Sequence, residues 1–169
     1  MVAAGRRRPS DVTLTAILPS LRRSIPDPLS SDLWPEATHP TTTDVIVAGV
    51  SLCRLAELCD TPCVHSAAAA LPGTHGRPSP SSTASVVVAT VLQVEAGRIR
   101  LDADLSTVAS DLAEARLIGR ASTAHPRAYV VGSLQDARVL LPEDILPGDL
   151  IAVPCAGNVC LRDIRGAGR

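Results

Sequence analysis

The longest apolar run of the chain constrains its fold more than any other feature. Residues 84–95 (ASVVVATVLQVE) and 97–105 (GRIRLDADL) are separated only by a short Ala-Gly step. Two such runs joined by a short glycine-containing turn predict a β-hairpin. Because the second run alternates apolar with charged residues, its apolar side chains share one face and its charged side chains share the other. We therefore expect a sheet protein that buries one face.

Further segments predict additional strands and only short helices. A helix is expected at 14–25, and another at 52–59, where apolar residues recur at helical spacing. Strands are expected at 43–50, 62–66, 114–120, 128–131, 138–141, 150–154 and 159–162, with a turn-rich connector over 141–149. This count predicts a mainly β protein, a barrel or sandwich with one or two short helices.

The organisation along the chain predicts one domain. The 169 residues are 46% hydrophobic, which is enough for a real core, and that core must consist of Val, Leu, Ile and Ala because aromatic residues are nearly absent. Residues 1–10 (MVAAGRRRPS) lack apolar periodicity and are expected to form a flexible tail. Residues 11–169 are expected to form a single β-domain, and within it 72–83 (PGTHGRPSPSST) is expected to be an exposed linker.

Charge and composition exclude several classes of function. Sixteen basic and seventeen acidic residues give a net charge of −1, so nucleic acid is not an expected partner. The sequence has no lysine, which excludes a covalent pyridoxal phosphate aldimine. No run of some twenty apolar residues predicts a membrane span. Five cysteines without a secretory signal favour a cytoplasmic protein.

Stretches near both ends of the chain resemble one enzyme family. They are DLWPEAT (32–38) with TDVIVAGVSLCRLAELCDTPCVH (43–65), and YVVGSLQDARVLLPEDILPGDLIAVPCAGN (129–158), in which LPED and PGDLIAVP match best. They resemble the diaminopimelate decarboxylases and other alanine-racemase-like decarboxylases, which join a pyridoxal phosphate barrel to a β-domain. Where that family carries its barrel, this chain has only 72–83. The resemblance implies a retained β-domain, similar to the family's C-terminal domain, that has lost the catalytic barrel.

The family's functional positions are largely replaced in this chain. Gln135 stands where the resemblance places an active-site cysteine, and Leu117 and Val159 stand where it places tyrosines. Asp102 matches an aspartate of the family, although the glycines beside it are lost. The resemblance therefore implies that decarboxylase activity is absent.

The candidate site consists of charged residues on the second strand of the hairpin, a similar alternating pair at Glu114 and Arg116, and polar residues further along the chain. Asp102, Asp104 and Glu114 are the candidate catalytic carboxylates, because crowding or burial can raise a carboxyl pKa for acid–base work. The candidate substrate-binding residues are Arg100, Arg116, Tyr129 and Gln135. The alternative is an exposed strand face on which opposite charges neutralise each other.

No metal site is expected. Cys59, Cys63 and His65 lie close together in the sequence, but their spacing is not that of a zinc knuckle. Thiols scattered in this way are usually buried as small hydrophobic groups.

These observations predict a cofactor-independent enzyme for a small organic metabolite. A cyclase, isomerase or lyase of a specialised biosynthetic pathway fits, because pocket shape and a few polar groups can direct such reactions. Loss of the barrel would expose apolar surface, so a homodimer is expected. The alternative functions are a non-catalytic accessory or regulatory partner of another enzyme, and a decayed fragment without activity.

Overall fold

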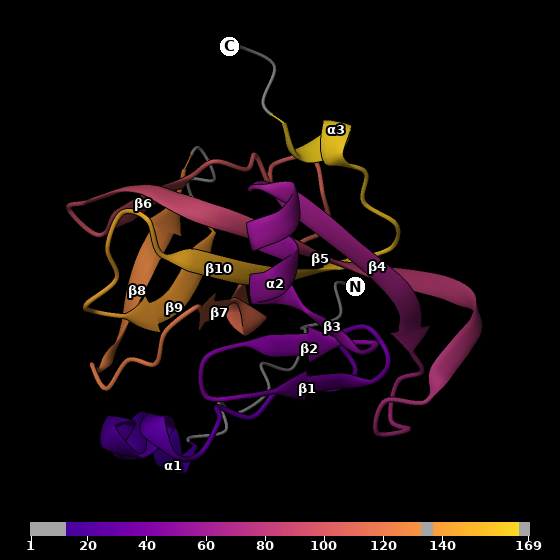
Figure 1. Ribbon diagram of the computed structural model, residues 1–169, viewed down its shortest axis with the longest axis horizontal. Helices are drawn as coiled ribbons and strands as arrows, with labels where there is room; N and C mark the ends of the chain where they lie inside the picture. The colour runs from indigo at the N-terminus through magenta and orange to yellow at the C-terminus, as the bar shows by residue number, and fades with distance from the viewer. Residues whose placement is uncertain (1–12, 133–136, 166–169) are drawn as a thin grey trace, which may run out of the picture.

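The computed structural model describes residues 13–132 and 137–165, and its fold is mainly β, with 41% strand and 16% helix. This confirms the expected fold class. Seven strands form the main sheet in the order β7-β10-β5-β6-β8-β9, and β4 pairs with β5 beside this path (Figure 1). They are β4 (Cys63–Ala70), β5 (Pro78–Glu95), β6 (Arg98–Leu101), β7 (Arg116–Ile118), β8 (Pro126–Val131), β9 (Arg138–Pro142) and β10 (Leu150–Ala156).

The expected hairpin forms the centre of this sheet. β5 and β6 pair antiparallel from Glu95↔Arg98 to Val91↔Leu101, as the sequence predicts. Most other pairs are also antiparallel, but β6 and β8 run parallel. The sheet curves until its two end strands, β7 and β9, lie near each other, which gives a nearly closed, barrel-like shape. We call the gap between β7 and β9 the seam.

Two cores lie on opposite faces of β5 because its side chains alternate. Val87, Ala89 and Val91 point into the barrel-like core, whereas Val86 and Val88 point into a second core outside it. Both cores are dominated by aliphatic residues, as the composition predicts. The long central strand therefore organises two layers.

The outer layer covers β5 and β10 with a small sheet and a helix (Figure 1). The small sheet contains β1 (Thr38–Pro40), β2 (Val45–Val47) and β3 (Val50–Ser51), and the helix is α2 (Leu52–Cys59). The helix matches its expected bounds and buries Leu52 and Ala56. Ser51 caps its first turn, with its side chain accepting from Arg54 N at 3.0 Å.

Four short helical turns complete the described chain. They are α1 (Leu14–Ile17), η1 (Pro19–Arg23), η2 (Leu112–Glu114) and α3 (Leu161–Ile164). The helix expected at 14–25 is thus divided into α1 and η1. Pro19 begins the second piece, because proline lacks the N–H that a continuous helix would need there.

Two corrections concern turns that the sequence analysis did not recognise. The strand expected over 43–50 is interrupted at Ala48-Gly49, where both residues have positive φ, 48° and 84°. The linker expected over 72–83 is largely exposed, although Ser79 is buried. Residues 78–83 belong to β5, and the turn 71–77 separates β5 from β4. Leu71 N donates to Arg77 O at 2.7 Å across this turn.

Two strands predicted near the C-terminal half also differ. The segment expected as a strand over 114–120 contains only β7, because η2 occupies its start. The strand expected over 159–162 is wrong, since α3 begins at Leu161. The Asp163 carboxylate accepts from Cys160 N at 2.8 Å, which favours a helical start there. The expected tail, 1–10, lies outside the described residues.

Candidate ligand-binding site at the seam

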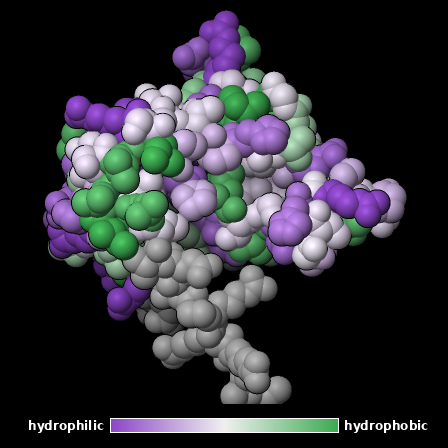
Figure 2. All heavy atoms as spheres, turned by 90° about the horizontal axis from the view of Figure 1, so that it is seen from below, coloured by the Kyte–Doolittle hydropathy of each residue, from purple (hydrophilic) through white to green (hydrophobic). Residues whose placement is uncertain are grey.

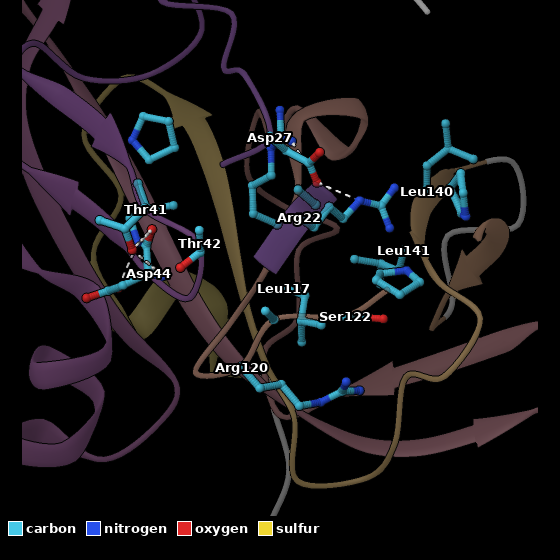
Figure 3. A pocket seen from close by; sticks show the side chains of 17 residues that line it. Arg22, Asp27, Thr41, Thr42, Asp44, Leu117, Arg120, Ser122, Leu140 and Leu141 are labelled. Atoms are coloured by element: carbon cyan, nitrogen blue, oxygen red, sulfur yellow. Dashed lines mark hydrogen bonds and ion pairs between the residues drawn. The ribbon is translucent and has the colours of Figure 1, made fainter. Parts of the chain in front are cut away.

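A small cavity of ≈ 90 Å³ lies at the seam. Arg116 and Leu117 of β7 line one side, and Leu140 and Leu141 of β9 line the other. Its remaining wall comes from η1, the connector after it, the β1–β2 loop and the loop after β7 (Figure 3). The cavity therefore exists because the sheet ends meet without closing.

Two arginines face one carboxylate at this cavity. Arg22 Nε lies 3.2 Å from Asp27 Oδ2, and Arg116 Nη1 lies 3.9 Å from the same oxygen. Arg22 Nη1 also donates to Ala124 O at 2.8 Å, and Arg116 donates to Pro28 O. These side chains are mostly buried, with 12% of Arg22 and 23% of Arg116 exposed.

One N–H donor of each arginine lacks a hydrogen-bond acceptor in the part of the chain that the structure describes. Among the described residues, Nε of Arg22 and Nε of Arg116 are buried and have no hydrogen-bond partner. The ion pair with Asp27 compensates charge without giving Arg22 Nε a well-aligned hydrogen bond. A buried donor left without an acceptor costs about 1–3 kcal/mol. Both Nε atoms are covered by protein atoms, so an acceptor from outside the protein could reach them only after a neighbouring group moves aside.

Glu114 holds Arg116 from behind the cavity. Its carboxylate lies 3.6 Å from Arg116 Nη2 and accepts from Ser30 N, Ser30 Oγ and Trp34 Nε1 at 3.1, 2.7 and 3.1 Å. Burial by itself would raise the pKa of Glu114, but the hydrogen bonds and the charge of Arg116 outweigh it and lower the pKa. Glu114 thus stays ionised and fixes the segment before β1 against the barrel.

A third arginine at the cavity is already neutralised. Arg120 donates to both carboxylate oxygens of Asp149, at 2.8 and 2.7 Å, and to Asp144 Oδ2 at 3.3 Å. Ser122 Oγ donates to Asp144 at 2.6 Å. Burial would raise the pKa of Asp144, but the bonds from Ser122 and Arg120 lower it. Arg120 is therefore part of the wall, and Arg22 and Arg116 keep the open donors.

The two aspartates proposed from the sequence lie elsewhere. β6 ends at Leu101, so Asp102 and Asp104 occupy the bend after it and do not share a strand face. Asp102 Oδ1 accepts from Thr90 N at 2.8 Å, and Asp104 Oδ1 accepts from Ser106 N at 2.9 Å. The bonds from Ser106 lower the pKa of Asp104. Asp102 therefore bonds to the backbone of β5 and Asp104 to the loop at Ser106, and neither lines the seam cavity.

The other predicted residues are also dispersed. Arg100 is exposed on β6, opposite Gln93. Tyr129 is buried in the barrel-like core, where its hydroxyl donates to Glu143 O at 3.3 Å and Arg127 lies over its ring. Gln135 lies outside the described residues. Of the predicted set, the structure brings together Glu114 and Arg116.

The cysteines and histidines do not form a cluster with metal-binding geometry. Burial raises the pKa of Cys63 to about 11 and that of Cys155 to about 12, and burial together with Asp44 raises that of Cys53 to about 12. Across the described ranges, 13–132 and 137–165, no group of three or more His, Cys, Asp or Glu side chains could hold a metal ion.

A larger, open groove of ≈ 710 Å³ lies on another side of the molecule. Its walls are mainly small side chains of β4, β5 and β10, together with Trp34 and the aspartates Asp32 and Asp111. Asp32 Oδ2 accepts from Gly73 N at 3.0 Å. In the described part of the chain, Arg22 Nε and Arg116 Nε are buried donors without partners, and both residues line the seam cavity. Neither residue lines this groove, so we place the candidate site at the seam.

The sequence analysis did not identify Arg22 and Asp27, which complete the site at the seam. Arg22 and Asp27 are separated from Arg116 by about ninety positions. Only the curvature of the sheet brings β7 next to the N-terminal segment, and no local pattern indicates this approach. Glu114 and Arg116 were among the predicted site residues, but they meet through a 3.6 Å ion pair between η2 and β7 and not on one strand face.

Together these features define a nearly closed β protein with a charged cavity at its seam. Comparisons of the chain with protein-family models, with curated proteins and with solved structures found no match. Within the part of the chain that the structure describes, no helix has the length and apolar character needed to cross a membrane.

Proposed function

We propose that this protein binds a small organic anion, without a cofactor, in the seam cavity. The observation that carries the proposal is the pair of buried guanidinium groups with unused donors, Arg22 and Arg116. Guanidinium groups recognise carboxylates through paired, charge-assisted hydrogen bonds. Ligand sites are typically concave and combine apolar walls with a few polar groups, as the seam cavity does.

The size of the cavity limits the ligand. One water molecule needs about 10–15 Å³ of cavity volume, counted as the space open to its centre. A cavity of ≈ 90 Å³ therefore has room for only a few heavy atoms. Leu117, Leu140 and Leu141 supply apolar contacts beside the arginines. A short carbon chain bearing one anionic group matches this lining.

Binding of propionate and of its neutral amide by the complete chain, measured by calorimetry, tests the proposal. We expect propionate to bind and propionamide not to bind, because the amide lacks the charge. Arg22→Gln should weaken propionate binding about tenfold or more, since it removes a charged hydrogen-bonding partner. Arg54→Gln is the matched control, because Arg54 is exposed and its side chain pairs with Glu57 alone among the described residues. Equal binding of both ligands, or no effect of Arg22→Gln, would contradict the proposal.

Catalysis on the bound metabolite stays a prediction. A cofactor-independent cyclase, isomerase or lyase needs an acid–base group at its substrate, and Asp102 and Asp104 do not line the seam cavity. Asp27 is the carboxylate beside the two arginines. Asp44 also lines the cavity, so proton transfer by a carboxylate at the seam would fall to Asp27 or Asp44.

One observation favours the second candidate, a non-catalytic accessory partner. Leu14, Ile17 and Leu18 of α1 and the residue after it expose 67%, 58% and 52% of their surface. Hydrophobic surface gathers on the side of the molecule where α1 lies (Figure 2). Such a patch is typical of surfaces that bind another protein. A homodimer would cover it equally well, and both partners remain proposals.

Descent from a decarboxylase-like β-domain also remains a proposal. It is supported by the motifs of the sequence and by the β4–β5 turn, because the segment expected in place of the barrel, 72–83, forms most of this turn and the start of β5. Leu71 and Arg77 are hydrogen bonded there at 2.7 Å. Removal of an inserted domain at this point would leave two strand ends that can pair directly.

A further inference from the structure

Asp27 occupies the position that the carboxylate of a ligand would take. Its Oδ2 lies between the two arginines, 3.2 Å from Arg22 Nε and 3.9 Å from Arg116 Nη1. Figure 3 shows Asp27 and Arg22 joined at one wall of the cavity. We propose that Asp27 is a built-in competitor, and that the ligand is a monocarboxylate that displaces it from the arginine pair. This inference rests on the proposed function and names the class of ligand for the same site.

The contacts of Asp27 are weaker than those a ligand can make. A carboxylate that faces a guanidinium edge accepts two parallel hydrogen bonds. Asp27 meets each arginine through a single close pair of atoms. In the described part of the chain, the Nε groups of Arg22 and Arg116 remain without hydrogen bonds. A free carboxylate can satisfy donors that the tethered Asp27 leaves open.

Asp27 can leave the arginines without disturbing regular structure. It lies between Pro26 and Pro28 in the connector between η1 and β1, outside every helix and strand. Its side chain is 31% exposed, so a change of rotamer can turn the carboxylate toward solvent. Displacement therefore breaks two ion pairs and no sheet hydrogen bond.

The surroundings favour a ligand with a single negative charge. Arg120 is neutralised by Asp144 and Asp149, so it offers little attraction to a second anionic group. Asp44, at the opposite wall, is held by bonds from Ser51 and from the backbone, and its charge repels such a group. A dicarboxylate would therefore gain nothing from its second charge, and the small volume disfavours its extra atoms.

The experiment compares the wild type with Asp27→Asn, using propionate, malonate and inorganic phosphate as probes in calorimetric titrations. Removal of a like charge about 4 Å from a bound carboxylate should lower the Kd for propionate about five- to tenfold. Glu57→Gln is the control for net charge, because Glu57 is exposed on α2 and does not line the seam cavity. It should leave the Kd unchanged. Asp27→Ser is a second variant, used with thermal unfolding to separate binding from folding.

Each outcome decides between the two claims. Tighter propionate binding by both Asp27 variants, with malonate and phosphate weaker, supports the inference. If the wild type binds propionate in an Arg22-dependent way but the Asp27 variants bind it equally or more weakly, Asp27 is not a competitor and the proposed function stands. If malonate or phosphate binds more tightly than propionate, the monocarboxylate assignment is wrong. If neither wild type nor variant binds any probe, both claims are wrong.

Discussion

At the scale of single residues, Glu114 joins the N-terminal segment to the barrel. It accepts three hydrogen bonds from Ser30 and Trp34 and forms an ion pair with Arg116. Only 13% of its side chain is exposed, so these contacts are little screened by solvent. The same residue therefore supports the fold and orients one of the arginines that we assign to the ligand.

Replacement of Glu114 by Gln should destabilise the protein, and more so at neutral pH than in acid. The lowered pKa of Glu114 means that its stabilising contribution is complete above the pKa of the unfolded chain and is lost as the pH falls through the folded pKa. We expect the free energy of unfolding at pH 7 to fall by about 1–3 kcal/mol. Urea unfolding followed by fluorescence of Trp34, the single tryptophan, measures this change. An equal loss at pH 7 and in strong acid, or the same loss in exposed Glu57→Gln, would count against this role.

At the scale of elements, two tight Ala-Gly turns determine the strand registers. Ala48-Gly49 connects β2 to β3, and Ala96-Gly97 connects β5 to β6, with positive φ at all four residues. Two-residue hairpin turns of this shape suit Asn-Gly better than Ala-Gly, because alanine is strained in the left-handed region. The chain thus carries local strain at its central hairpin.

Opposite substitutions in the β5–β6 turn should have opposite effects. Ala96 has φ 46° and Gly97 has φ 78°. Ala96→Asn should raise the free energy of unfolding by about 1 kcal/mol, whereas Gly97→Ala should lower it by about 1–2 kcal/mol. Chemical denaturation of both variants beside the wild type measures the pair. Shifts in the same direction would show that turn conformation does not control this hairpin.

The sequence predicts elements well where a local pattern decides them. The β5–β6 hairpin and α2 follow directly from alternation and from helical spacing. Prediction failed where a turn or a cap interrupts an apolar segment, as at Ala48-Gly49 and at α3. The linker over 72–83 was misjudged because its prolines and serines are unfavourable in a strand interior, whereas the N-terminal part of β5 lies beyond the end of its pairing with β10.

The candidate site was less predictable because it depends on contacts distant in sequence. Asp102 and Asp104 have the residue types of a catalytic pair, yet each is bonded to a nearby backbone N–H. Arg22 and Asp27 show no such pattern and are recruited by the approach of the N-terminal segment to β7. A sequence shows which residues could take part in catalysis or binding, but the tertiary fold decides which of them lie next to one another.

At the scale of the whole molecule, the unclosed sheet is what creates the site. β7 and β9 approach each other, and the wall between them is completed by η1 and two loops. A fully closed barrel would have left no room for the cavity, and an open sheet would have left the arginines in solvent. Because the arginines are buried at the seam, their hydrogen bonds to an anion would be stronger than hydrogen bonds made in solvent.

An NMR titration of the arginine side chains tests most directly whether Arg22 and Arg116 bind a carboxylate at the seam. Nε–Hε resonances of ¹⁵N-labelled protein are followed while propionate is added, with assignments from Arg→Gln variants. We predict saturable shifts for Arg22 and Arg116, and little change for Arg120, whose donors are held by Asp144 and Asp149. Resonances of Arg22 and Arg116 that stay fixed throughout, or that move no more than those of exposed Arg54, would contradict a ligand site at the seam.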